Sequence, residues 1–136
     1  KTGVVLASVK RLAERVLRSE KVSSVGSLSI ILVGDREIQA LNRQYLHKNS
    51  PTDVLAFPLD ESGVLSGEVY VSTEQAELQA KQYRVSFENE LSRLVVHGVL
   101  HLVGYDDRKS NARKRIRERE GHYLKNFCLV RMKTKT

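Results

Sequence analysis

The sequence has almost no cysteine, no long apolar run and no repetition. Its one cysteine, Cys128, excludes a disulfide within the chain and fits a reducing compartment such as the cytosol. No apolar run approaches the roughly 20 residues that a membrane-spanning helix needs, and no signal-peptide pattern precedes the first expected helix. Internal repeats, low-complexity stretches and linkers are missing too. We therefore expect a cytoplasmic protein without membrane association, in which residues 1–136 form one domain.

Positive charge, by contrast, is abundant and unevenly placed. The chain has 23 Lys and Arg against 16 Asp and Glu, for a net charge of +7. Residues 108–136 carry 11 basic against 2 acidic residues, whereas residues 1–107 carry 12 against 14. A basic C-terminal helix and tail of this kind indicates a polyanionic partner such as RNA, DNA or an anionic membrane face. A solvated basic helix explains the charge equally well, so the charge does not name a partner.

The pattern of apolar residues and turns predicts five helices and three strands. In chain order we expect a helix over 4–17, a strand over 28–33, a helix over 35–46, strands over 53–57 and 67–71, and helices over 73–83, 87–103 and from 110 to beyond 127. This order is typical of a small α/β or α+β domain. Strand pairing and strand direction do not follow from it.

Four helix ends have recognisable capping residues. We expect Asp35 to be the N-cap of its helix, and Ser72 with Gln75 to form a capping box for the next one. Ser86 is the expected N-cap of the helix over 87–103, and Gly104 is well placed to end that helix in a left-handed turn.

A metal site is the chemical feature that the sequence indicates most clearly. His97 and His101 lie four residues apart, so both imidazoles project from one helix face and suit one tetrahedral ion. Two histidines at this spacing are more often packing or surface residues. Gly104 and then Asp107 change that balance, because a chain reversal at the glycine would return Asp107 as a third ligand. We expect one divalent ion at the C-terminal end of this core helix, most simply zinc; iron, nickel and manganese suit the same ligands.

Two histidines and one carboxylate leave a coordination position for water, which is typical of catalytic zinc. The spacing H-x3-H-x2-G-x2-D resembles the extended zinc signature of the metzincin proteases. In those proteases a Glu follows the first His and acts as general base, whereas this chain has Gly98 there. We therefore rank a metalloprotease-like hydrolase last among the candidate functions.

The same segment, HGVLHLVGYDD, resembles the H-G-x-L-H-L-x-G-Y-D-H signature of the YbeY family of bacterial rRNA-maturation endoribonucleases. EIQALNRQYLHKNSPTDVLAFP and SGEVYVSTEQAELQA resemble two further blocks of the family, in its order and spacing. The resemblance implies an α+β fold, with a small mixed sheet packed against helices. It also implies a single-strand-specific, metal-dependent endoribonuclease that acts on RNA in 16S rRNA maturation and ribosome quality control. The implied metal ligands are His97, His101 and Asp107.

The chain departs from the family pattern at two positions. The third ligand of the family is usually His, and here it is Asp107, which is shorter and adds a negative charge. The family also has an Arg after the Tyr of the earlier block, where this chain has Leu46. Arg43, His47 and Lys48 lie nearby and could supply the positive charge instead.

Two functions from different classes remain open on the sequence alone. One is the metal-dependent endoribonuclease, in which either metal-bound water or the 2′-hydroxyl of the RNA is the nucleophile. The other is an RNA- or ribosome-binding factor whose metal is structural. Lys48 is the one side chain near the site that we connect with catalysis, and Tyr105 either stacks on a base or, as we favour, buttresses the turn. The residues expected to contact RNA are Arg43, Lys48, Arg113, Lys114, Arg115 and Arg117.

Overall fold

The computed structural model describes the backbone of residues 2–22, 25–47, 52–59, 64–105 and 109–135. Its elements are α1 (Thr2–Ser19), β1 (Val25–Val33), α2 (Asp35–Leu46), β2 (Val54–Pro58), β3 (Leu65–Ser72), α3 (Thr73–Tyr83), α4 (Phe87–Val103) and α5 (Ser110–Lys135). Each element expected from the sequence is present in the expected order, with ends that differ by a few residues. No helix in the described ranges is long and apolar enough to cross a membrane.

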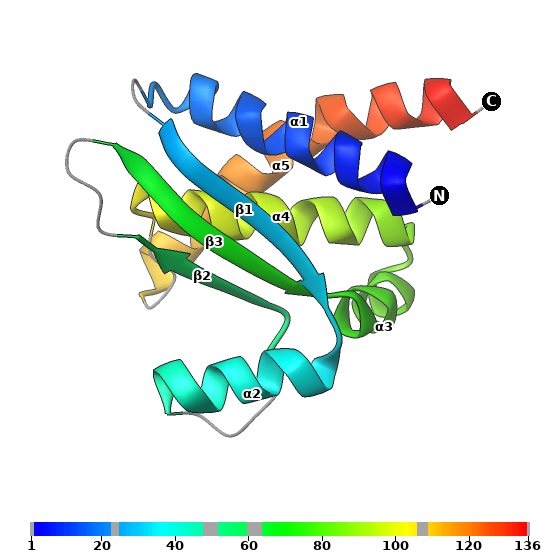
Figure 1. The fold of residues 1–136 in the computed structure, drawn as a ribbon. Helices are drawn as coiled ribbons and strands as arrows, with labels where there is room; N and C mark the ends of the chain where they lie inside the picture. The colour runs from blue at the N-terminus through cyan, green and yellow to red at the C-terminus, as the bar shows by residue number, and fades with distance from the viewer. Residues whose placement is uncertain (1, 23–24, 48–51, 60–63, 106–108, 136) are drawn as a thin grey trace.

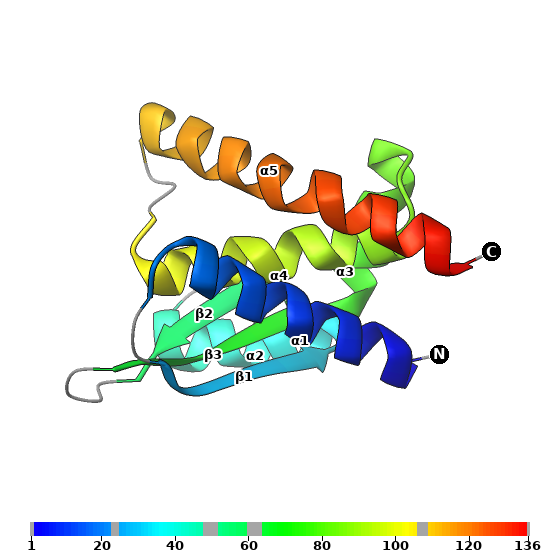
Figure 2. The same ribbon diagram turned by 90° about the horizontal axis from the view of Figure 1, so that it is seen from above.

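The three strands form one mixed sheet in the order β1-β3-β2. β1 pairs parallel with β3, and β2 pairs antiparallel with it. The sheet stands in front of α4 in Figure 1, with α2 beneath it. Seen from above, α4 lies between the sheet and α5 (Figure 2), and α4 contacts both. The fold is therefore the α+β arrangement of a small mixed sheet and five helices that we expected.

The central element of the core is α4, since it packs against the sheet, α1, α3 and α5. Its apolar residues recur at helical spacing and are buried on more than one face: Leu91, Leu94, Val95, Val96, Val99, Leu100 and Leu102. From the sheet, Val69 and Val71 of β3 are fully buried in the same cluster. Burying one such side chain stabilises the fold by about 1.5–3 kcal/mol. The helix that carries the two histidines is thus held on several sides by the core.

The ends of α4 match the sequence prediction. The Ser86 hydroxyl accepts a hydrogen bond from the Asn89 N–H at 3.0 Å, as an N-cap does. At the other end Gly104 has φ = 121°, a conformation that other residues rarely adopt, and its N–H donates to the carbonyl of His101. The helix therefore ends at Val103, two residues after the second histidine, and Gly104 is its C-cap, as predicted.

The start of α2 differs from the prediction. Gly34 is the N-cap, so the assignment of Asp35 to that role was wrong. The Asp35 carboxylate instead accepts hydrogen bonds from the Ser72 hydroxyl (2.7 Å) and the Gln75 side chain (3.1 Å). Ser72 does cap α3 through the Gln75 N–H, but its own N–H donates to the Asp53 carbonyl, so the capping box is only half formed. Asp35 joins α2 to α3, a contact between residues 37 to 40 positions apart.

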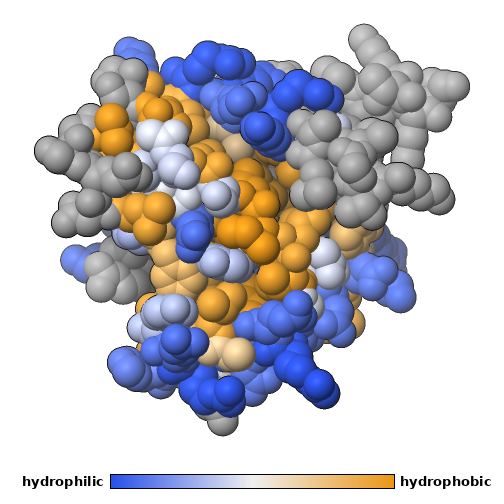
Figure 3. All heavy atoms as spheres, in the orientation of Figure 1, coloured by the Kyte–Doolittle hydropathy of each residue, from blue (hydrophilic) through white to orange (hydrophobic). Residues whose placement is uncertain are grey.

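The sheet face turned away from α4 is partly open. Figure 3, in the orientation of Figure 1, shows apolar surface across the middle of this face between hydrophilic borders above and below. Tyr45 of α2, Phe57 of β2 and Tyr70 of β3 meet edge to face on it, with ring centroids 5.5 and 5.8 Å apart. This geometry is favourable for aromatic pairs and holds α2 against the sheet.

Candidate metal centre

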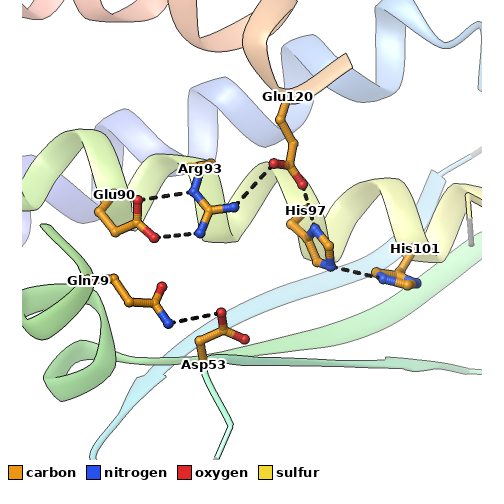
Figure 4. A network of polar contacts seen from close by, with 7 residues as sticks. All are labelled: Asp53, Gln79, Glu90, Arg93, His97, His101 and Glu120. Atoms are coloured by element: carbon orange, nitrogen blue, oxygen red, sulfur yellow. Dashed lines mark hydrogen bonds and ion pairs between the residues drawn. The ribbon is translucent and has the colours of Figure 1, made fainter. Parts of the chain in front are cut away.

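The two histidines of α4 meet as their spacing predicted. His97 Nε2 and His101 Nε2 lie 3.0 Å apart, and the ring centroids are separated by 4.6 Å (Figure 4). Two imidazole nitrogens at this distance repel each other if both present lone pairs, so a proton or a cation must lie between them. The His97 side chain is 18% exposed, which leaves the pair accessible from solvent.

The pair opens into a pocket of about 340 Å³ between α4 and β2. One wall comes from β2 and the residues before it, and the other from α4. The lining residues are Thr52, Asp53, Val54, Leu55, Ala56, Pro58, His97, Gly98, His101 and Leu102. Among these described residues Asp53 is the one carboxylate, and none is Lys or Arg. The Asp53 carboxylate accepts a hydrogen bond from the Gln79 side chain at 3.3 Å, and Figure 4 shows Asp53 across the gap from His97.

Gly98 determines how closely α4 approaches the sheet. A Cβ atom on this residue would lie 2.5 Å from a methyl of Val69 and 3.1 Å from a methyl of Val54. Position 98 therefore faces the sheet, whereas His97 lies beside the pocket and contacts Glu120 of α5. A Glu at position 98 would point into the core, so the packing excludes the general base of the metzincin pattern at this place.

A carboxylate supports the His97 ring from behind. Glu120 of α5 is 3% exposed, and its Oε2 lies 2.5 Å from His97 Nδ1. Its other oxygen accepts from Arg93 at 3.2 Å. The contact with the carboxylate places the ring proton on Nδ1, because the carboxylate can only accept. Nε2 of His97 is then left with a lone pair directed at His101.

Arg93 connects this carboxylate to a second buried one. Its guanidinium donates to both oxygens of Glu90, at 3.0 and 2.5 Å, and Glu90 is 1% exposed. Burial alone would lower the pKa of Arg93, but hydrogen bonds and charge attraction from Glu90 and Glu120 outweigh it and raise that pKa. We call the set of Glu90, Arg93, Glu120, His97 and His101 the histidine network.

The histidine network beyond the two imidazoles was not found from the sequence. Glu120 had a visible signal, because it lies four residues after the buried Ile116 and three before the buried Tyr123. A charged residue on the inward face of a basic helix needs a buried partner. That reasoning would have found a buried carboxylate, but not that its partner is His97, 23 residues away.

A second buried network lies where α1, α4 and α5 meet. Glu20 accepts hydrogen bonds from Tyr105 (2.8 Å), Arg119 (2.6 Å) and Tyr123 (2.5 Å). Burial would raise the pKa of Glu20, but these hydrogen bonds, with Tyr123 and Arg119 contributing most, hold it below its ordinary value of 4.5. We call these residues the tyrosine network. Since Tyr105 follows Gly104 and is bonded to α1, the structure favours its role as a buttress of the turn.

The remaining residues predicted for the site fall into three groups. Asp107 and Lys48 lie outside the described residues. Arg43 is exposed on α2, close to Leu46, which is 46% exposed. The residues of α5 that we expected to contact RNA are also exposed and do not line the histidine pocket. They are Arg113, Lys114, Arg115 and Arg117. Within the described residues no cluster of three or more His, Cys, Asp or Glu side chains has metal-binding geometry, so the histidine pair is the part of the site that the structure describes.

The chain is similar over most of its length to proteins of one family. The family model described as Endoribonuclease YbeY matches residues 2–128. A Carboxydothermus hydrogenoformans protein named Endoribonuclease YbeY is 45% identical over 108 residues, which cover 78% of this chain and 76% of the relative. A Chlorobaculum tepidum protein of the same name is 40% identical over 110 residues, covering 81% and 80%. The solution structure of a Thermotoga maritima protein is 34% identical, with a TM-score of 0.71 over 98% of this chain and 88% of that one. The chain therefore belongs to the YbeY family of endoribonucleases.

Proposed function

We propose that this protein is a metal-dependent endoribonuclease that cleaves single-stranded RNA, with one zinc ion held by His97, His101 and Asp107. The observation that carries the proposal is the 3.0 Å separation of the two Nε2 atoms beside a pocket. Nitrogen ligands about 2.0–2.1 Å from one tetrahedral zinc lie about 3.3 Å apart, so a small ring movement suffices to admit the ion. The family membership supplies RNA as the substrate class.

The donor set fits a catalytic ion. Two imidazoles with one carboxylate would make a three-ligand site of the kind that leaves a coordination position for water. When bound, the ion supplies Lewis acidity towards a phosphate oxygen. The protein supplies the rest: α4 fixes the spacing of the histidines, and the β2 wall limits the approach of water and RNA to one side.

Asp53 is the residue that we assign to proton transfer. It is the one carboxylate among the described lining residues, and the Gln79 amide holds its side chain in place. A carboxylate in this position can accept the proton of an attacking hydroxyl, whether from water or from the ribose 2′ position. For the RNA backbone we propose Arg43, Lys48 and the exposed basic residues of α5 as the source of positive charge.

For the biological role we propose 16S rRNA maturation and ribosome quality control, in line with the family resemblance of the sequence. The alternative, a binding factor whose metal is structural, is favoured by one observation. Leu46, which is 46% exposed, occupies the position of the Arg that the family pattern has after the Tyr. If Leu46→Arg raises a weak activity severalfold, the lost guanidinium explains weak catalysis.

The deciding experiment measures zinc content and cleavage of single-stranded RNA for wild type, His101→Ala and His122→Ala. His122 is an exposed histidine on α5 and serves as the matched control. We expect His101→Ala to lose its zinc and at least roughly 100-fold in cleavage rate, since its Lewis acid is lost. We expect His122→Ala to keep both. Full zinc content and full activity in His101→Ala would overturn the ligand assignment, and zinc-loaded wild type that leaves RNA uncut would favour the binding factor.

A further inference from the structure

We propose that Glu120 is the positioning residue of the metal centre: it fixes the His97 imidazole so that Nε2 presents its lone pair to the ion. This rests on the proposed function, because it assumes that His97 is a ligand. Glu120 belongs to α5 and lies on the side of the ring opposite the pocket. It would act on the metal only through His97.

The first argument is the geometry of the ring. One nitrogen of His97 lies 2.5 Å from Glu120 Oε2 and the other lies 3.0 Å from His101 Nε2. With both ends held, the ring cannot turn to exchange its two nitrogens. The hydrogen bond to a carboxylate also makes the imidazole a stronger donor to the ion, as carboxylate partners of metal-bound histidines generally do.

The second argument is how Glu120 itself is held. Its Oε1 accepts from Arg93, and Arg93 is in turn fixed by two hydrogen bonds to Glu90. Glu90 and Arg93 lie on α4, the same helix as His97, so the chain of contacts leaves α4, passes through Glu120 on α5 and returns to α4. A carboxylate held at both oxygens in this way has one orientation available.

The third argument concerns charge. Glu90 and Glu120 are 1% and 3% exposed, and Arg93, which pairs with both, carries one positive charge for their two negative ones. Arg117 lines the same pocket as these three residues but is exposed to solvent. Burying the second charge is costly unless a positive charge lies close to it. Zinc on the far side of the His97 ring would supply that charge. The ion and the buried carboxylate therefore stabilise each other through the imidazole, and α5 becomes part of the metal centre.

The test compares the zinc dissociation constants of wild type, Glu120→Gln, Glu118→Gln and Tyr123→Phe, measured by competition with a chelating dye. Glu120→Gln keeps the shape and an acceptor for His97 but removes the charge. Glu118 is exposed on the same helix, and Tyr123→Phe weakens the attachment of α5 through the tyrosine network without touching His97. We expect zinc affinity to fall about 10- to 100-fold in Glu120→Gln and to stay within twofold in the two controls.

A second measurement does not depend on how the variants fold. Long-range ¹H–¹⁵N correlation spectra of zinc-loaded wild type should place the His97 ring proton on Nδ1, facing Glu120. A proton on Nε2 would overturn the proposal, and so would zinc affinity in Glu120→Gln within twofold of wild type. An equal loss of affinity in Tyr123→Phe would show that Glu120 acts only by holding α5. Failure of wild type to bind zinc would contradict the proposed function itself, which separates the two ideas.

Discussion

Two buried networks attach α5 to the rest of the protein, and they end in different ways. In the tyrosine network three side chains donate to Glu20, and one of them, Tyr105, lines a pocket whose described lining holds no His, Cys, Asp or Glu. In the histidine network the chain of contacts ends on imidazole nitrogens beside a pocket. Both contain an arginine paired with carboxylate: Arg119 with the partly buried Glu20, and Arg93 with the buried Glu90 and Glu120. A buried ionic network can thus serve binding as well as folding where, as at His97 and His101, its last side chains present nitrogen atoms to a pocket.

The largest effect should come from a substitution in the pocket beside the histidine network. We expect Asp53→Asn to lower the rate of RNA cleavage about 100-fold or more, because the pocket loses its proton acceptor. Zinc affinity should change much less than the cleavage rate, since the proposed ligands His97, His101 and Asp107 are all retained. Single-turnover cleavage rates and dye competition measure the two quantities.

Glu88→Gln is a suitable comparison for Asp53→Asn, because Glu88 is an acidic residue at the start of α4 that does not line the pocket. Its cleavage rate should equal that of wild type. A cleavage rate for Asp53→Asn within threefold of wild type would remove Asp53 from the mechanism.

The next effect should come from the tyrosine network and should appear in stability rather than catalysis. We expect Glu20→Gln to lower the free energy of unfolding at pH 7 by about 1–3 kcal/mol, because the hydrogen bonds from three side chains lose their charged acceptor. The pKa of Glu20 is lowered in the folded state, so its stabilisation is present above 4.5 and is lost as pH falls through the folded value. Urea unfolding between pH 3 and pH 7 should therefore show a shallower acid decline in Glu20→Gln than in wild type. Parallel declines in the two proteins would show that the charge of Glu20 contributes nothing.

The smallest effect should come from the exposed face of α5, which belongs to neither network. We expect Lys114→Gln with Arg115→Gln to weaken binding to single-stranded RNA a few-fold at moderate salt. If both side chains contact phosphates, the slope of log affinity against log salt should fall by about 1.4. Lys81→Gln, on the exposed surface of α3, is the control. An unchanged slope in the double variant would show that the basic charge of α5 is solvated and not used for RNA.

The sequence was sufficient for those features that depend on local geometry. The helix period brought His97 and His101 to one face, and the left-handed turn at Gly104 followed from residue type alone. Contacts between distant elements could not be predicted in this way. Glu120 reaches His97 only because α5 docks on α4, and Asp53 reaches the pocket only because β2 runs beside α4. Asp35 was misassigned because Ser72 and Gln75, far along the chain, compete for its oxygens.

The close contact at Gly98 has a consequence for how this site could evolve. Neighbouring positions of α4 have separate roles. His97 lines the pocket, and Gly98 allows the close contact of the helix with Val69 and Val54. A mutation from Gly98 to Glu would therefore not simply exchange one hydrolytic mechanism for another. The Glu side chain would first have to separate the helix from the sheet. The variant would therefore fold poorly, and selection would remove it before any new activity appeared. Packing at Gly98 thus separates the zinc site proposed for this chain from the metzincin pattern, although the two sequence signatures differ little.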